Sequence, residues 1–361
     1  MEERVSRQLV IILSIIAFGI FLSNGSLAGE KQGNGYGQRS IQVSSIAIYP
    51  ANPSIIYIGT QLGAFKITDN GSRWVSVSKG LKNTEVLTLA VDPVNTRTLY
   101  AGTRCGAFKS IDGGDNWTLM KSCLSEVAVQ SIKIDPINTD TLYALAKDAA
   151  WLMVVYKNSK DESRLESRLR DCAFKSINGG EKWSSIDIGF DEINLKLESF
   201  AIDPSNPSTL YAGTRCGVFK SVDFGAKWPA KKCSLKELHI KSIAVDPNNS
   251  NTVYAGTMVG VFKSIDGGCN WSYLDNGLKK SDVLSLAISP DNSNTVYSGT
   301  VNGVFKTTNG GSNWLELNTG LNRSNTKTIA IDPDNSNILY AGTLDGLYKS
   351  TNAGGNWVAL K

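Results

Sequence analysis

Short apolar runs separated by turn-forming residues repeat along most of the chain. Each repeat begins with an apolar segment such as residues 89–91 or 329–331, and Asp-Pro usually follows, as at Asp92-Pro93. A β-rich run ending in Gly comes next, as in residues 98–102, and then a Phe-Lys segment that leads to a Gly-rich turn and Trp. Apolar runs of this length between turn signals predict strands, and the repeat itself shows no helical period.

The repeated Trp residues give the period of this pattern. They are Trp74, Trp117, Trp183, Trp228, Trp271, Trp314 and Trp357, with successive spacings of 43, 66, 45, 43, 43 and 43 residues. Seven units of four short strands each predict an all-β fold, a seven-bladed β-propeller with four antiparallel strands per blade over residues 43–361. The repeat overrides the two or three domains that 361 residues would otherwise suggest.

The turn before each Trp resembles the Asp-box of the BNR repeat family, as in Ser110-x-Asp112-x-Gly114-x-x-Trp117. The resemblance covers residues 43–361 and implies that the box joins the third and fourth strands of each blade. The acid or amide side chain is expected to accept backbone N–H bonds within the turn, which is a structural role. The residues at this position are Asp69, Asp112, Asn178, Asp223, Asp266, Asn309 and Asn352; blade 1 departs most, with Ile67 in place of Ser or Thr.

The N-terminus has the pattern of a signal peptide. Arg4 and Arg7 precede a 14-residue apolar run, residues 9–22, and small residues follow up to Ala28. This run is short for a membrane span, so we expect residues 1–28 to be a cleaved signal peptide, residues 29–42 a flexible leader, and the protein to be secreted or periplasmic. An uncleaved N-terminal anchor is the alternative. A net charge of +4 without a basic cluster argues against nucleic-acid binding.

The largest irregularity lies in blade 3, between its second and third strands. Tyr143 and Phe174 are 31 residues apart, against 8 for Tyr100 and Phe108, so about 23 residues are inserted. The insert is either a hairpin extension that packs on its own blade or a partner contact. Its candidate partner-binding residues are Trp151, Leu152, Met153 and Tyr156.

Four of the six cysteines occur in two similar pairs. Cys105 with Cys123, and Cys216 with Cys233, flank the Asp-boxes of blades 2 and 4. Each pair is expected to meet across the third and fourth strands, so the sequence predicts disulfides Cys105–Cys123 and Cys216–Cys233, which export would permit. Cys172 and Cys269 are expected to be reduced. Without a C-x-x-C motif, and with His239 the only histidine, no metal site or cofactor is predicted.

Charged residues supply two further candidates on the face that carries the links between blades. Carboxylates precede the innermost strand of five blades and are either solvated turn residues or a ring at the tunnel mouth: Glu85, Glu126, Glu192, Glu237 and Asp282. Arg104 and Arg215 occupy matching positions beside cysteines and are expected to lie away from the innermost strands. Together with the insert, they predict a partner-binding sector near blades 2–4.

The resemblance alone leaves function open, because BNR repeats occur in sialidases, xyloglucanases, sortilin-type receptors and photosystem II assembly factors. The carboxylates are spread over five blades, which argues against one catalytic pair. Our leading hypothesis is an exported, non-catalytic propeller, with no catalytic residues, that binds a protein or carbohydrate partner or assists assembly. A glycoside hydrolase of sialidase-like type is the alternative.

Overall fold

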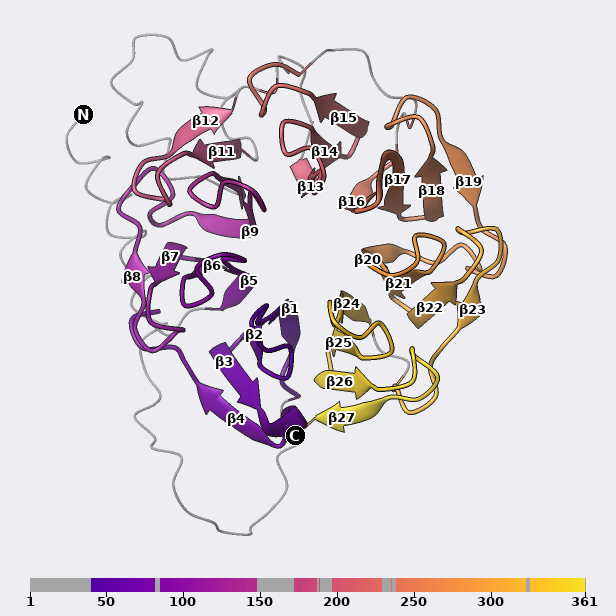
Figure 1. Cartoon of the computed structure of the whole chain (residues 1–361), viewed down its shortest axis with the longest axis horizontal. Coiled ribbons are helices and arrows are strands. Elements are labelled where there is room, and N and C mark those ends of the chain that lie inside the picture. The colour runs from indigo at the N-terminus through magenta and orange to yellow at the C-terminus, as the bar shows by residue number, and fades with distance from the viewer. Residues whose placement is uncertain are drawn as a thin grey trace, which may run out of the picture. The chain divides into compact units, whose positions relative to one another are not determined.

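The computed structural model divides the chain into two units, residues 1–39 and 40–361, and describes residues 40–81, 85–147, 172–186, 188, 197–228, 235, 238–322 and 325–360. The described residues form seven antiparallel sheets arranged as the blades of a propeller (Figure 1). The predicted all-β, seven-bladed fold is therefore confirmed. No described helix is long and apolar enough to cross a membrane.

Consecutive strands build each blade from the axis outward. Blades 1 to 3 contain β1 (Val43–Ile48), β2 (Ile56–Thr60), β3 (Gly63–Thr68) and β4 (Arg73–Ser76); β5 (Val86–Val91), β6 (Leu99–Thr103), β7 (Gly106–Ser110) and β8 (Thr118–Leu119); and β9 (Ala128–Ile134), β10 (Leu142–Lys147), β11 (Cys172–Ser176) and β12 (Ser184–Ile186). A 3-10 turn, η1 (Asp69–Gly71), joins β3 to β4.

Blades 4 to 7 follow the same order. They contain β13 (Leu197–Ile202), β14 (Leu210–Thr214) and β15 (Gly217–Ser221); β16 (Ile240–Asp246), β17 (Asn249–Thr257), β18 (Gly260–Ser264) and β19 (Ser272–Leu274); β20 (Val283–Ile288), β21 (Val296–Thr300), β22 (Gly303–Thr307) and β23 (Leu315–Glu316); and β24 (Thr326–Ile331), β25 (Leu339–Thr343), β26 (Leu347–Ser350) and β27 (Val358–Leu360). Within the described residues blade 4 has three strands.

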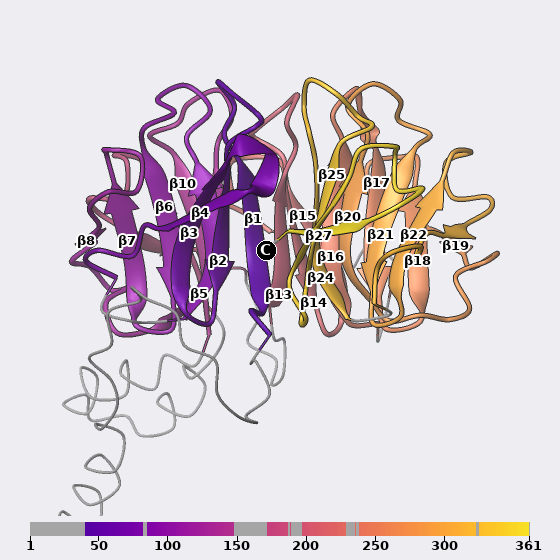
Figure 2. The ribbon, with the colours of Figure 1, turned by 90° about the horizontal axis from the view of Figure 1, so that it is seen from below.

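Antiparallel pairing gives the propeller two distinct faces. Turns between strands one and two and between strands three and four lie on one face, here called the Asp-box face, which is uppermost in Figure 2. Turns between strands two and three, and the links between blades, lie on the opposite, inter-blade-loop face. The innermost strands surround the axis in Figure 1.

The hydrophobic cores lie between neighbouring blades. One core joins Tyr57 of blade 1 to Leu99, Phe108 and Trp117 of blade 2, all nearly inaccessible to solvent. The blades approach so closely that a Cβ on Gly102 would lie 2.5 Å from the Val129 carbonyl oxygen of blade 3, so only Gly fits there. Sheet stacking therefore depends on small residues in strand two as well as on the large ones.

A repeated polar contact also links neighbouring blades. In blade 4, Tyr211 Oη and Lys220 Nζ both donate to the carbonyl oxygen of Gly267 in the Asp-box of blade 5, at 3.2 and 3.0 Å. The Lys220 ammonium also lies 5.4 Å from the centre of the Tyr211 ring. In blades 2, 3, 5 and 6 the equivalent Tyr and Lys side chains also donate to a carbonyl oxygen in the Asp-box of the next blade.

The first and last blades close the ring without exchanging a strand, because each of their sheets is built from consecutive strands. Side-chain packing is not the only interaction that holds this seam. Lys349 Nζ donates to Asn70 Oδ1 at 3.3 Å, and Ser40 Oγ donates to the Leu344 carbonyl at 3.2 Å, so hydrogen bonds also cross it.

Candidate functional site

The Asp-box turns are held by hydrogen bonds from within the motif. In blade 2, Asp112 Oδ1 accepts from Ser110 Oγ and from the Asn116 backbone N–H, at 2.8 and 2.9 Å, while the Gly114 N–H donates to Ser110 Oγ. Asn178, Asn309 and Asn352 accept the corresponding bonds. These side chains are occupied in shaping the turn, and Gly113 and Gly114 take the positive φ that it requires.

The predicted disulfide Cys105–Cys123 is wrong, because both cysteines are free thiols. Cys105 lies in the β6–β7 turn. Cys123 lies in a separate turn, closed by the Ser125 N–H donating to the Ser122 carbonyl, and its Sγ faces the Trp183 carbonyl of blade 3 at 3.9 Å. Leu124, rather than Cys123, lies against Gly106 at the start of β7. The Cys123 sulfur is therefore directed at blade 3 rather than at Cys105.

Cys216 is also a free thiol in the structure, so the second predicted disulfide is not formed there either. Its intended partner, Cys233, lies outside the described residues.

Charged side chains gather on the inter-blade-loop face, where the innermost strands begin. Glu85, just before β5, forms an ion pair with Arg104 of the β6–β7 turn. Glu198 of β13 pairs with Arg215 at 3.1 Å and with Lys147 of blade 3 at 3.6 Å. Lys241 and Asp282 form a further ion pair, and Lys327 lies near Glu85 and Arg104. We call these eight residues the axial charge cluster: Glu85, Arg104, Lys147, Glu198, Arg215, Lys241, Asp282 and Lys327.

The fourth ion pair of the axial charge cluster connects blades 5 and 6. Lys241 Nζ lies 2.6 Å from Asp282 Oδ2. The other carboxylate oxygen of Asp282 and the side-chain oxygen of Asn325 are buried and have no hydrogen-bond partner among the described residues. A buried acceptor without a donor costs free energy.

Lys327 connects the axial charge cluster to blade 7 through its electrostatic interactions with Glu85 and Arg104. Desolvation lowers the pKa of the Lys327 ammonium; Glu85 of blade 2 opposes this shift and Arg104 adds to it. At Glu198, desolvation raises the carboxyl pKa, but Lys147, Arg215 and His239 together outweigh it, and the net shift is downward. A carboxyl group that is held ionised in this way is unsuited to act as a general acid near neutral pH.

The outcomes for the predicted charged residues are therefore mixed. Arg104 and Arg215 were expected away from the innermost strands, and this was wrong. In the β5–β6 pairing Val86 lies opposite Thr103, so Glu85 and Arg104 are the next opposed residues, and Arg215 reaches Glu198 within β13. Glu126 is exposed in a turn with positive φ.

Several of the candidate residues lie outside the described residues. They are two of the predicted carboxylates and the four insert residues: Glu192, Glu237, Trp151, Leu152, Met153 and Tyr156.

Sequence reasoning missed Glu198, Lys241, Lys327 and Lys133. Lys133 lies in β9 where the other six blades have alanine, namely Ala47, Ala90, Ala201, Ala244, Ala287 and Ala330. It keeps access to solvent, yet the surrounding protein desolvates its ammonium and lowers its pKa. Comparing the innermost strands position by position would have revealed these substitutions.

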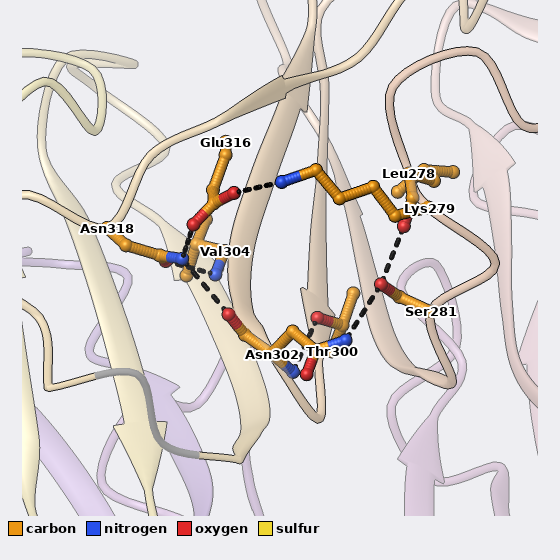
Figure 3. Close-up of polar contacts among 8 residues, drawn as sticks. All are labelled: Leu278, Lys279, Ser281, Thr300, Asn302, Val304, Glu316 and Asn318. Carbon is orange, nitrogen blue, oxygen red and sulfur yellow. Dashed lines mark hydrogen bonds and ion pairs between the residues drawn. The ribbon is translucent and has the colours of Figure 1, made fainter.

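A separate network of polar side chains lies around blade 6 on the inter-blade-loop face (Figure 3). Lys279 pairs with Glu316 at 2.8 Å, and Asn318 donates to both Glu316 and the Asn302 carbonyl. Asn302 in turn donates to Ser281 Oγ at 3.1 Å. The polar groups of this turn satisfy one another, which favours the axial charge cluster as the candidate site. Among the described residues, no group of three His, Cys, Asp or Glu could hold a metal ion.

The fold resembles propellers of several functions, whereas no family model and no curated protein sequence matches the chain. A GH74 xyloglucanase from Xanthomonas campestris matches with a TM-score of 0.70 and 14% identity over 90% of this chain and 55% of the enzyme. The extracellular domain of a putative one-component system from B. thetaiotaomicron matches at 0.64 and 18%, over 87% of this chain and 39% of that one. YCF48 bound to D1 peptide matches at 0.63 and 12%, over 86% and 93%.

These matches show that the fold is shared. The chain spans about half the length of the xyloglucanase and less of the sensor domain, but nearly all of YCF48. At such low identity they assign no activity. The chain is thus similar in fold to hydrolase, sensor and peptide-binding propellers.

Proposed function

We propose that the chain is an exported, non-catalytic propeller that binds an anionic segment of a protein partner, or an acidic glycan, at the axial charge cluster. The observation that carries this proposal is the excess of cations in the cluster, five against three carboxylates. A net positive charge attracts and orients a ligand of negative charge. The cluster lies around the axis, where side chains from several blades can contact one ligand.

The hydrolase alternative has less support. A glycosidase needs two carboxyl groups about 5–10 Å apart, one of them an acid with a raised pKa. Glu85 and Asp282 lie in blades 2 and 6, and each is engaged by a basic side chain. Likeness in fold to GH74 enzymes does not by itself supply a catalytic pair.

The blade 3 insert is proposed to extend the same binding site. Lys147, the last residue of β10, pairs with Glu198, so the chain leaves blade 3 beside the axial charge cluster. We propose that four residues which follow Lys147 in the sequence contact a partner held at the cluster: Trp151, Leu152, Met153 and Tyr156.

An experiment with defined ligands tests the proposal. Purified protein is applied to synthetic peptides graded in Asp and Glu content and to an array of neutral and acidic glycans. We expect binding that rises with ligand acidity and falls with salt, because exposed charges are screened. The variant Arg104→Ala/Arg215→Ala/Lys241→Ala should lose roughly tenfold or more in affinity if each charge contributes about 0.5–1 kcal/mol.

The matched control is Arg73→Ala/Lys79→Ala/Lys121→Ala. It removes three exposed basic residues outside the axial charge cluster, so the net charge changes by the same amount. Equal loss in both variants would mean that the attraction is nonspecific, and binding that is indifferent to ligand charge would overturn the proposal.

A further inference from the structure

Lys133 occupies a position of the innermost strands that is alanine in the other six blades. It lies opposite Tyr143 in the β9–β10 pairing, and each alanine lies opposite the equivalent tyrosine of its own blade. Those residues are Ala47, Ala90, Ala201, Ala244, Ala287 and Ala330. Six blades stack with only a methyl group at this position, so the fold itself does not require a lysine there.

The Lys133 side chain extends from the apolar core to solvent on the propeller axis. The alanines at this position lie against the next blade: Ala90 packs on the core between blades 2 and 3, and Ala201 belongs to the core between blades 4 and 5. Lys133 is nevertheless exposed, because its longer chain carries the ammonium past such a core. Strand β9 is the innermost of its blade and is flanked by β5 and β13, so the solvent that Lys133 meets is on the axis (Figure 1).

The strands that pack on β9 leave Lys133 without a carboxylate partner among the described residues. These strands are β5, β6, β7, β10 and β13, and their only carboxylate is Glu198. Glu198 is paired with Lys147 and Arg215. It lies three strand positions nearer the inter-blade-loop face than the level of Lys133, which is roughly 10 Å at 3.3 Å per residue.

The carboxylates of the turns between strands one and two are also occupied. Asp135, two residues after Lys133, accepts two N–H groups of its own turn, and Asp92 and Asp203 do the same in the neighbouring blades. All three are nearly inaccessible to solvent. Desolvation accordingly lowers the pKa of Lys133 without an opposing carboxylate, whereas Asp135 opposes the same effect at Lys175.

A desolvated ammonium without a counter-charge costs free energy, and an anion that accepts its hydrogen bonds offsets this cost. We propose that Lys133 binds a small monovalent anion, such as a halide, on the axis of the propeller. A single ammonium supplies one unit of charge, and the alanine methyl groups at the same level offer no hydrogen-bond donor. A weakly hydrated monovalent ion therefore fits better than sulfate or phosphate. The site lies beyond the axial charge cluster, involves no partner protein and does not depend on the proposed function.

Bromide is a suitable probe of this site, because its anomalous scattering locates it in a crystal. The thermal midpoint of the full chain is measured in sodium bromide and in sodium sulfate at equal ionic strength. An anion that binds only the folded state raises the midpoint. Relative to sulfate, bromide should therefore favour the wild type over Lys133→Ala by roughly 1–3 °C, and a bromide peak should lie beside the Lys133 ammonium.

Matched variants separate this site from general salt effects. Lys121→Ala removes an exposed lysine outside the innermost strands and should respond to bromide as the wild type does. Lys133→Met keeps an apolar stem without the charge, so it should lose the bromide response even if Lys133→Ala also loses packing. An equal response in the wild type and both Lys133 variants would overturn the proposal. So would a bromide peak at Lys133 without a difference in solution, because the site would then hold an adventitious ion only.

Discussion

Lys349 of the last blade donates a hydrogen bond to the side-chain oxygen of Asn70 in the first, at 3.3 Å, across the seam that closes the ring. In blade 5 the corresponding Lys263 shares its acceptor, the Gly310 carbonyl, with Tyr254. No such tyrosine bond crosses the seam among the described residues. Lys349→Met should therefore lower the free energy of unfolding by about 1 kcal/mol and by more than Lys263→Met. Urea unfolding of both variants checks this; an equal loss would contradict the special position of the seam.

Acid should weaken the boxes that contain aspartate. Hydrogen bonds from the Asn116 side chain and backbone and from Ser110 lower the pKa of Asp112 to about 2, and bonds from Asn270 and Ser264 do the same for Asp266. A lowered pKa stabilises the fold above the unfolded value of about 4, and this contribution is lost as the pH falls toward 2. Asp112→Asn/Asp266→Asn should flatten the decline in unfolding free energy between pH 4 and 2. Blades with Asn178, Asn309 and Asn352 show that asparagine fits the turn.

The thiols give a chemical test of the cysteine assignment. Cys105 and Cys123 should both be alkylated by iodoacetamide in the folded protein without prior reduction. Burial raises the pKa of the Cys123 thiol, so less thiolate is present and the reaction at pH 8 should be slower than that of N-acetylcysteine. Peptide mass mapping after timed alkylation measures both rates. If both cysteines react only after a reductant is added, the Cys105–Cys123 disulfide is present and the assignment of free thiols is wrong.

The blade count followed from the sequence because each unit carries its own strand, turn and Trp signals. The boxes were also predictable, since their hydrogen bonds join residues only two to four positions apart. The ion pairs were missed because Lys147–Glu198 and Lys241–Asp282 join different blades, and only the ring brings those residues together. The disulfide prediction failed because the Cys123 sulfur is directed at Trp183 of the next blade, a neighbour that only the folded ring brings close.

Removal of the blade 3 insert tests its proposed role. Residues 148–171 are replaced by a short turn copied from Arg104, Cys105 and Gly106 of blade 2, which joins the equivalent strands. We expect an unchanged thermal midpoint, because β10 and β11 keep their pairing, and weaker binding of the acidic ligands identified on the arrays. If the deletion variant is folded and its binding is unchanged, the insert does not contribute to the binding site.

The role of the central carboxylates separates a binding protein from a hydrolase. The wild-type protein and the variants Glu85→Ala, Glu126→Ala, Glu237→Ala and Asp282→Ala are incubated with fluorogenic glycosides, including sialosides. A binding propeller should release no fluorophore above the buffer rate. Turnover that disappears in two of these variants would establish a catalytic pair and contradict the non-catalytic assignment.

The central claim is most directly tested by the affinity of the strongest acidic ligand from the arrays, measured by calorimetric titration on the wild type, on Arg104→Ala/Arg215→Ala/Lys241→Ala and on Glu198→Gln. The triple variant should bind roughly tenfold or more weakly. Glu198→Gln should bind more tightly, because Lys147 and Arg215 lose their carboxylate partner. Unaltered affinity in the triple variant, or weaker binding by Glu198→Gln, would contradict a ligand site at the axial charge cluster.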